Sequence, residues 1–281
     1  MSGRGEISAS SNYVVRLGSF ARLSLAQLVR PPSHSRRAEA ARRWARHSLW
    51  LTASIGVAII VLMYALDARE IGLMPPRGTA SLWPVRILTD FGKSTYVLWL
   101  LAAIIVVIAA AVPLARGLSR FVLIKLGTRI LFIFFAVLIP VLVGEAIKDI
   151  AGRGRPFVGG QANAFNFSLF DGTEAYASFP SGHAVTAFAL AFAVSALWPR
   201  ARVPMLIYAV AIAASRLVLL AHHPSDVVAG ALLGVIGMMF VRYWFAARHL
   251  AFTIRSDGAI EPLAGPSFGH LKRVARGAFA P

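Results

Sequence analysis

The sequence predicts an all-α polytopic membrane protein with six transmembrane helices. Of its 281 residues, 57% are hydrophobic, a larger share than the roughly 45–50% of soluble domains. Apolar runs recur between residues 48 and 246, and each approaches the roughly 20 residues that a helix needs to cross a hydrocarbon core of about 30 Å. We therefore expect one six-helix domain over residues 48–246, between basic cytoplasmic tails at residues 1–47 and 247–281.

The first tail holds nine arginines and two glutamates. It lacks the apolar stretch that follows the basic start of a secretory signal peptide. Five of its apolar residues fit one face of a short amphipathic helix lying on the membrane: Val14, Leu17, Phe20, Ala21 and Leu28. A flexible basic tail is the alternative interpretation.

The six expected spans follow in order. They run approximately over residues 48–66, 95–114, 130–147, 181–198, 203–220 and 227–245. The third contains Pro140 and Glu145, and the fourth begins at a Ser-Gly turn. The last three spans lie near the lower length limit for crossing a bilayer.

Basic residues orient these spans. Four clusters fall on one side of a six-span chain: Arg36, Arg37, Arg42, Arg43 and Arg46; Arg116, Arg120, Lys125 and Arg129; Arg200 and Arg202; Arg242, Arg248 and Arg255. That side is expected to be cytoplasmic. The opposite side carries fewer: Arg69, Arg77, Arg86 and Lys93. We therefore interpret the net charge of +17 as this bias plus attraction to anionic lipids, and we expect no nucleic-acid partner, since no recognition fold is visible.

Cations gather at the expected non-cytoplasmic ends of the spans. Lys148 ends the third span, and Arg155 follows it. Arg216 lies within the fifth span, where a charge is costly without a partner. The planar fork of arginine suits phosphate oxygens, so these three cations predict a phosphate site. Arg153 is expected to be an interfacial cation without a role in the site.

The run Pro180-Ser181-Gly182-His183 is typical of a helix start. Serine is a good N-cap, and glycine lets a ligand approach the backbone. Free N–H groups at a helix N-terminus bind anions. A plain loop-to-helix junction is the alternative.

Two histidines and an aspartate complete the candidate site. His222 and Asp226 are four residues apart, and Pro224 between them favours a tight turn. One nitrogen of His222 is available to attack phosphorus if Asp226 holds the other, and His183 is placed to protonate a leaving oxygen. His223 is expected either to support the site residues from behind or to be purely structural. The chain has no cysteine, which excludes a thiol nucleophile and a Cys-ligated zinc.

Three stretches of the sequence form one pattern: Lys148-(six residues)-Arg155-Pro156, then Pro-Ser-Gly-His at 180–183, then Ser215-Arg216-(five residues)-His222-(three residues)-Asp226. Together they resemble the signatures of the type 2 phosphatidic acid phosphatase superfamily. The spans are similar to its integral-membrane lipid phosphatase branch, which is related to class A acid phosphatases and vanadium haloperoxidases. The resemblance implies that His222 is the nucleophile forming a phosphohistidine, Asp226 its orienting group and His183 the general acid. It also implies that no cofactor or metal is needed. The phosphate would be bound by Lys148, Arg155, Ser181, Gly182 and Arg216.

The expected substrate is a phosphorylated membrane lipid at the outer face of a bacterial inner membrane. Candidates are undecaprenyl pyrophosphate, lipid A phosphate, phosphatidylglycerophosphate and phosphatidic acid. The loop over residues 157–179 is expected to act as a lid or specificity element, and the run Asp90-Phe91-Gly92-Lys93-Ser94 is expected to be either a loop over the pocket or a helix start.

Three alternatives compete with the lipid phosphatase. A lipid phosphotransferase would use the same site, and a non-catalytic phospholipid-binding protein would need only the cations. An intramembrane serine protease is disfavoured because Phe179 stands where Gly-x-Ser-Gly requires glycine.

Overall fold

The computed structural model describes residues 13–32, 37–156, 158–160 and 162–265. The outer parts of both predicted tails, residues 1–12 and 266–281, lie outside the described residues, as do residues 33–36 and two positions of the predicted lid, 157 and 161. The chain is mostly helical. Its elements are α1 (Tyr13–Val29), α2 (Arg37–Ala65), α3 (Asp67–Leu73), η1 (Ala80–Leu82), α4 (Trp83–Asp90), α5 (Ser94–Ala111), α6 (Gly117–Ala151), η2 (Glu174–Tyr176), α7 (Gly182–Leu197), η3 (Pro199–Ala201), α8 (Arg202–Val218), α9 (Pro224–Ala247), β1 (Phe252–Ile254) and β2 (Ile260–Pro262).

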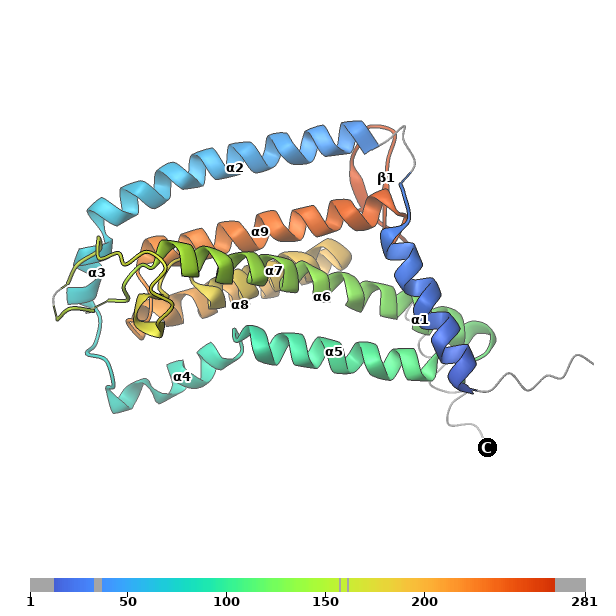
Figure 1. Cartoon of the computed structure of the whole chain (residues 1–281), viewed down its shortest axis with the longest axis horizontal. Helices are drawn as coiled ribbons and strands as arrows, with labels where there is room; N and C mark the ends of the chain where they lie inside the picture. Colours follow the sequence, from blue (N-terminus) through green and yellow to red (C-terminus); the bar gives the residue numbers. More distant parts are fainter. Residues whose placement is uncertain (1–12, 33–36, 157, 161, 266–281) are drawn as a thin grey trace, which may run out of the picture.

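The long helices form one bundle. Helices α2 and α5 to α9 run along the long axis of the molecule (Figure 1). Within the described residues, five helical segments are long and apolar enough to cross a membrane: Ala41–Ala65, Ala80–Ala111, Gly117–Ala151, Pro199–Val218 and Pro224–Ala247. The prediction of a mostly helical membrane protein is confirmed, whereas five of the six predicted spans are found as candidates and the fourth, α7 (Gly182–Leu197), is a shorter apolar helix.

Helix α7 is the predicted fourth span, but it is shorter than the other five. Its 16 residues extend over about 24 Å at 1.5 Å per residue. Half of its side chains are buried, most of them alanine, because α6, α8 and α9 pack around it. Since protein rather than lipid surrounds much of this helix, its length is not set by the thickness of the hydrocarbon core.

The cytoplasmic loop expected between the second and third spans is largely helical. Helix α6 begins at Gly117, so Arg120, Lys125 and Arg129 lie in its first turns. Long basic residues are good helix formers, and their stems cover apolar surface while their charges reach outward. Arg129 is buried and donates from Nη2 to the Leu263 carbonyl at 2.7 Å.

The predicted N-terminal amphipathic segment forms helix α1. It crosses one end of the bundle at a steep angle (Figure 1). The Tyr13 hydroxyl donates to the Ala110 carbonyl at 3.0 Å, and Trp244 Nε1 donates to the Leu28 carbonyl at 3.2 Å. Of the five residues expected on one face, Leu17, Phe20 and Leu28 are half-buried, whereas the other two are exposed. The expected apolar face is therefore only partly the face that packs.

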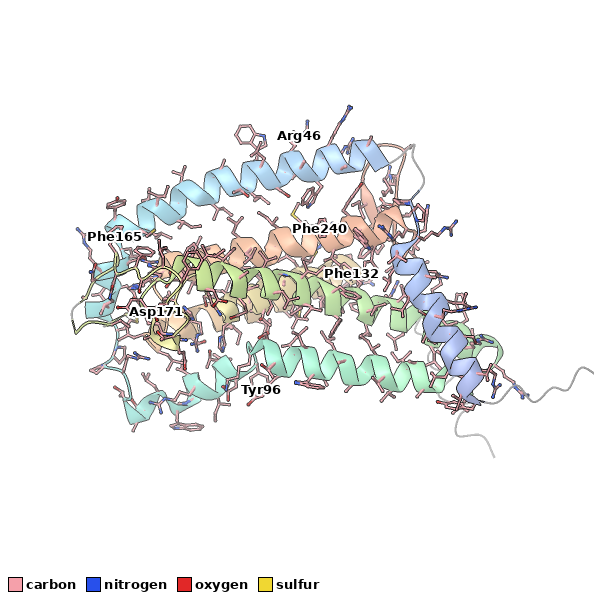
Figure 2. The ribbon with its side chains drawn as sticks, in the orientation of Figure 1. Arg46, Tyr96, Phe132, Phe165, Asp171 and Phe240 are labelled. Carbon is pink, nitrogen blue, oxygen red and sulfur yellow. The ribbon has the colours of Figure 1, made fainter. Side chains whose placement is uncertain are left out.

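Two features of the interior fix how the helices meet. Phe132 lies within the bundle (Figure 2) and packs edge-on against Phe245 and Phe252, with ring centroids 5.5 and 4.7 Å away. Helices α7 and α9 approach closely at Gly234, where a Cβ atom would lie 2.5 Å from the Val185 carbonyl oxygen. This close approach holds the N-terminal ends of α7 and α9 beside each other.

Candidate active site

The three signature stretches meet at one end of the bundle. The C-terminal ends of α6 and α8, the N-terminal ends of α7 and α9, and the connection over residues 152–181 lie together there, opposite α1 and β1 (Figure 1). Phe165 and Asp171 of this connection mark the same end (Figure 2). Helices α3 and α4 also lie there (Figure 1), although none of the predicted site residues belongs to them.

A cavity of about 530 Å³ opens at this end. Its wall contains six of the eight predicted site residues: Lys148, Arg155, Gly182, His183, Arg216 and His222. The remaining wall comes from Arg86, Thr89, Asp90, Lys93, Ser94, Thr95, Glu145, Glu174 and Leu219. The other two predicted residues, Ser181 and Asp226, are fully buried and are not part of the wall. The fold thus brings together side chains that are up to 78 positions apart, from 148 to 226.

The end of α6 places Lys148. Gly152 caps the helix in the left-handed conformation with φ of 53° and donates its N–H to the Lys148 carbonyl. A side chain at Gly152 would collide with the Ser168 carbonyl, so glycine is required for this αL helix end. The Lys148 ammonium lies 2.7 Å from Glu145 Oε1, which orients it in the last turn.

The two arginines are held from different directions. Arg155 donates from Nε to the Glu174 carbonyl at 3.0 Å, and its Nη2 lies 3.2 Å from Glu174 Oε1. Burial lowers the pKa of Arg155 from an ordinary value so high that the group remains a cation. Arg216 donates from Nη1 to the Thr89 hydroxyl at 2.9 Å. A buried cation with one neutral partner is well suited to an anionic ligand.

The start of α7 offers donors to an anion. Ser181 is the N-cap, but its side chain makes no capping hydrogen bond, and its N–H donates to the Asp226 carbonyl at 3.0 Å. Within the part of the chain that the structure describes, the buried atoms Ser181 Oγ and His183 Nε2 have no hydrogen-bond partner. A Cβ atom at Gly182 would lie 3.1 Å from Lys148 Nζ, so glycine admits the ammonium to the helix terminus. Such termini bind phosphate.

His222 is buried and held in one tautomer. Its Nδ1 lies 2.8 Å from the Ser178 carbonyl oxygen. Because a carbonyl only accepts, Nδ1 carries the proton and Nε2 keeps its lone pair. Burial lowers the pKa of His222 well below 6.5, and the charges of Arg216 and Arg155 lower it further. The imidazole is therefore neutral at pH 7, as a nucleophile must be.

The expected direct hydrogen bond from His222 to Asp226 is absent from the described site. Nδ1 lies 4.0 Å from Asp226 Oδ2, and this oxygen instead accepts the Ser178 hydroxyl at 2.6 Å and the His223 N–H at 2.9 Å. The turn at Pro224 points the carboxylate at these groups, since Asp226 lies in the first turn of α9. Asp226 thus acts on His222 through Ser178, whose carbonyl holds the ring.

Arg153 was expected to be an interfacial cation, and this expectation is wrong. The side chain is 1% exposed. Its Nη2 lies 2.8 Å from Asp67 Oδ2, and its Nη1 lies 2.5 Å from Asp226 Oδ1. Its carbonyl also accepts the Ser178 N–H at 3.0 Å. Arg153 therefore joins α3, the connection over residues 152–181 and α9 behind the cavity.

Asp67 is a site residue that the sequence analysis missed. It is fully buried at the start of α3, and it accepts hydrogen bonds from the Ser225 N–H at 3.0 Å and the Ser225 hydroxyl at 2.5 Å. Nearby, burial and the negative charges of Asp67 and Asp226 together raise the pKa of Glu70 to about 7. The sequence does contain a signal for Asp67 and Glu70. Two acidic residues directly after an apolar span indicate a buried partner, because charged groups at a membrane are costly without one.

The arrangement defines a helical membrane protein with a cation-rich, histidine-containing cavity at one end of its bundle. Residues 129–250 form a PAP2 superfamily domain.

Curated relatives share this region. The lipid A 1-phosphatase of Rhizobium johnstonii is 35% identical over 127 residues, which are 45% of this chain and 52% of that protein. The lipid A 1-phosphatase of Rhizobium etli is 33% identical over 142 residues, or 50% and 60% of the two chains. The bacitracin transport permease protein BcrC of Bacillus licheniformis is 30% identical over 138 residues, or 48% and 66%. The chain thus spans between about half and two thirds of these relatives' lengths. No solved structure matches it.

Proposed function

We propose that the protein is a metal-independent lipid phosphatase that hydrolyses a phosphomonoester or diphosphate through a phosphohistidine at His222. The observation that carries the proposal is the tautomer of His222: Nδ1 is engaged by the Ser178 carbonyl at 2.8 Å, so Nε2 is free in a cavity that contains Lys148, Arg155 and Arg216. These cations supply the positive charge that a transferring phosphoryl group needs.

The reaction has two steps. In the first, His222 Nε2 attacks phosphorus, the bond to the lipid oxygen breaks, and His183 donates a proton to that oxygen. The phosphorylated ring is a cation, which the Ser178 carbonyl and the carboxylate of Asp226, 4.0 Å from Nδ1, stabilise. In the second, His183 takes a proton from water as its oxygen attacks phosphorus, and the N–P bond breaks to release phosphate.

The proposed topology has six spans, with α7 as the short central one, both termini in the cytoplasm and the site at the periplasmic face of a bacterial inner membrane. The arginines near the ends of α2, α6, α8 and α9 that lie away from the cavity support it, because such bias marks cytoplasmic ends. The names of the relatives favour a phosphorylated lipid substrate, with lipid A 1-phosphate as the first to test. A phosphotransferase that passes the group to a second lipid is the runner-up.

A phosphate-release assay tests the proposal. Purified full-length protein in detergent is given lipid A, undecaprenyl pyrophosphate, phosphatidylglycerophosphate and phosphatidic acid, with and without a chelator. We expect release from at least one lipid, unchanged by chelator, and an acid-labile phosphoprotein that His222→Ala lacks. His183→Ala should lower the rate about 10²–10⁴-fold. Release that survives in His222→Ala, or that is lost to chelator, would contradict the mechanism, and transfer to added lipid without free phosphate would favour the runner-up.

Orientation is tested separately with single cysteines, since the chain has none of its own. Arg69 and Arg200 are both exposed and lie on opposite faces in the proposed topology. A membrane-impermeant maleimide added to intact spheroplasts should label Arg69→Cys but not Arg200→Cys, and the reverse pattern would invert the topology.

A further inference from the structure

The cavity contains more cations than the three signature stretches provide. Arg86 of α4 and Lys93, just before α5, share the wall with Lys148, Arg155 and Arg216. Positioned cations around one phosphoryl group are what its transfer requires, and the signature stretches already supply three. The run from Asp90 to Ser94, left open between a loop and a helix start, is the turn between α4 and α5, and it forms part of this wall.

This turn is fixed against the reacting side of the cavity. Thr89 accepts the hydrogen bond from Arg216 Nη1 at 2.9 Å, and the Phe91 carbonyl accepts the Tyr208 hydroxyl at 2.8 Å. A Cβ atom at Gly92 would lie 3.3 Å from His183 Cδ2 and would collide with a side-chain carbon of α8. Lys93 follows directly after these contacts, so its backbone is held at a set place beside both the general acid and a phosphate-binding arginine.

Lys93 is oriented in the same way as the signature cations. Its ammonium lies 2.8 Å from Asp90 Oδ1, just as Lys148 lies 2.7 Å from Glu145 and Arg155 lies 3.2 Å from Glu174. An ammonium has three donors, and Asp90 takes one. The Lys93 side chain is 42% exposed, so its other donors remain accessible to a ligand in the cavity.

We infer that Arg86 and Lys93 form a second anion subsite that holds another phosphate of the same substrate, adjacent to the phosphoryl group that His222 receives. The inference rests on the proposed function and narrows it, because a subsite of this kind favours lipid diphosphates over lipid monophosphates. Lys93 and Arg86 are specificity-determining residues in this account, whereas Lys148, Arg155 and Arg216 serve the transferred group of either substrate.

The test compares wild type, Lys93→Met and the double variant Arg86→Met/Lys93→Met with Arg69→Met. Arg69 is an exposed cation at the same end of the bundle and is not part of the cavity wall. For each protein, kcat/KM is measured on undecaprenyl pyrophosphate and on undecaprenyl phosphate. Losing a charge-assisted hydrogen bond should lower the diphosphate-to-monophosphate ratio of kcat/KM about tenfold or more in Lys93→Met, and Arg69→Met should keep the wild-type ratio.

Inhibition gives a second readout. Inorganic pyrophosphate should inhibit wild type at a concentration about tenfold or more below that of inorganic phosphate, and Lys93→Met should narrow this gap. If the double variant keeps both the wild-type ratio of kcat/KM and the wild-type difference between the two inhibitory concentrations, the second subsite is overturned. The proposed phosphatase function would be unaffected by that result. If wild type releases phosphate from no lipid, the proposed function fails, and the subsite is then judged by thermal shifts. Stronger stabilisation of His222→Ala by pyrophosphate than by phosphate, abolished on adding Lys93→Met, would support it, and equal stabilisation would reject it.

Discussion

Replacing Arg153 with methionine should destabilise the protein more than any change of a surface cation. The substitution keeps much of the apolar stem but removes the only cation that contacts both Asp67 and Asp226 within the described residues. Both carboxylates are fully buried. Breaking a buried ion pair by removing one partner costs about 3–5 kcal/mol, because the remaining charge is left without compensation.

The remaining hydrogen bonds place the expected cost at the lower end of this range. Asp67 keeps the N–H and hydroxyl of Ser225, and Asp226 keeps the hydroxyl of Ser178 and the N–H of His223. We therefore expect a loss of about 3 kcal/mol in the free energy of unfolding, which corresponds to a fall in Tm on the order of 10 °C for a chain of this size.

Thermal unfolding in detergent, followed by circular dichroism, measures this loss. Arg69→Met is the matched control, because Arg69 is an exposed arginine of α3. The double variant Arg153→Met/Asp67→Asn should lose less than the sum of the two single variants, since neutralising Asp67 removes one of the stranded charges. A fall in Tm no larger than that of Arg69→Met, or strict additivity in the double variant, would refute the reasoning.

Three further predictions follow from the same end of the bundle. The lowered pKa of His222 places the acidic limb of the pH profile of kcat/KM below pH 6.5. Arg216→Gln should move that limb to higher pH, because it removes a cation that disfavours protonation of His222. A wild-type limb at pH 6.5 would contradict this prediction. The pKa of Glu70 is about 7 in the folded chain against 4.5 ordinarily, so its contribution to stability is fully present below pH 4.5 and is lost as the pH rises through 7. When Tm is measured against pH, Glu70→Gln should show a smaller fall in Tm between pH 4.5 and 7 than wild type. Equal slopes of Tm against pH in the two proteins would count against this prediction. Gly234→Ala should lower Tm by overpacking against the Val185 carbonyl, at a cost of about 1–3 kcal/mol, whereas Gly56→Ala, with no atom within 4 Å of the new Cβ, should not.

The sequence predicted those parts of the molecule that depend on local signals. Apolar runs located the membrane helices because hydropathy is summed over a window and needs no tertiary information. Helix ends were less predictable: α6 extends back to Gly117 because its basic residues favour helix as readily as loop. The shortness of α7 reflects its enclosure by α6, α8 and α9, which no local signal reports.

The candidate site likewise has residues that the sequence predicts and contacts that it does not. Spacing and residue type indicated Lys148, Arg216 and His222, and the fold brings them to one cavity. The group that holds His222 is a backbone carbonyl, at Ser178, and any residue type supplies a carbonyl. Arg153 resembled an ordinary interfacial cation because its partners lie 86 positions before it and 73 after it.

The cavity and the residues that support it extend well outside the matched PAP2 superfamily domain. The matched domain covers residues 129–250, yet Asp67 pairs with Arg153, and Thr89 accepts the hydrogen bond from Arg216. Lys93 adds a cation to the same wall. The segment over residues 67–94 therefore holds two arginines of the matched domain and lines part of the same cavity.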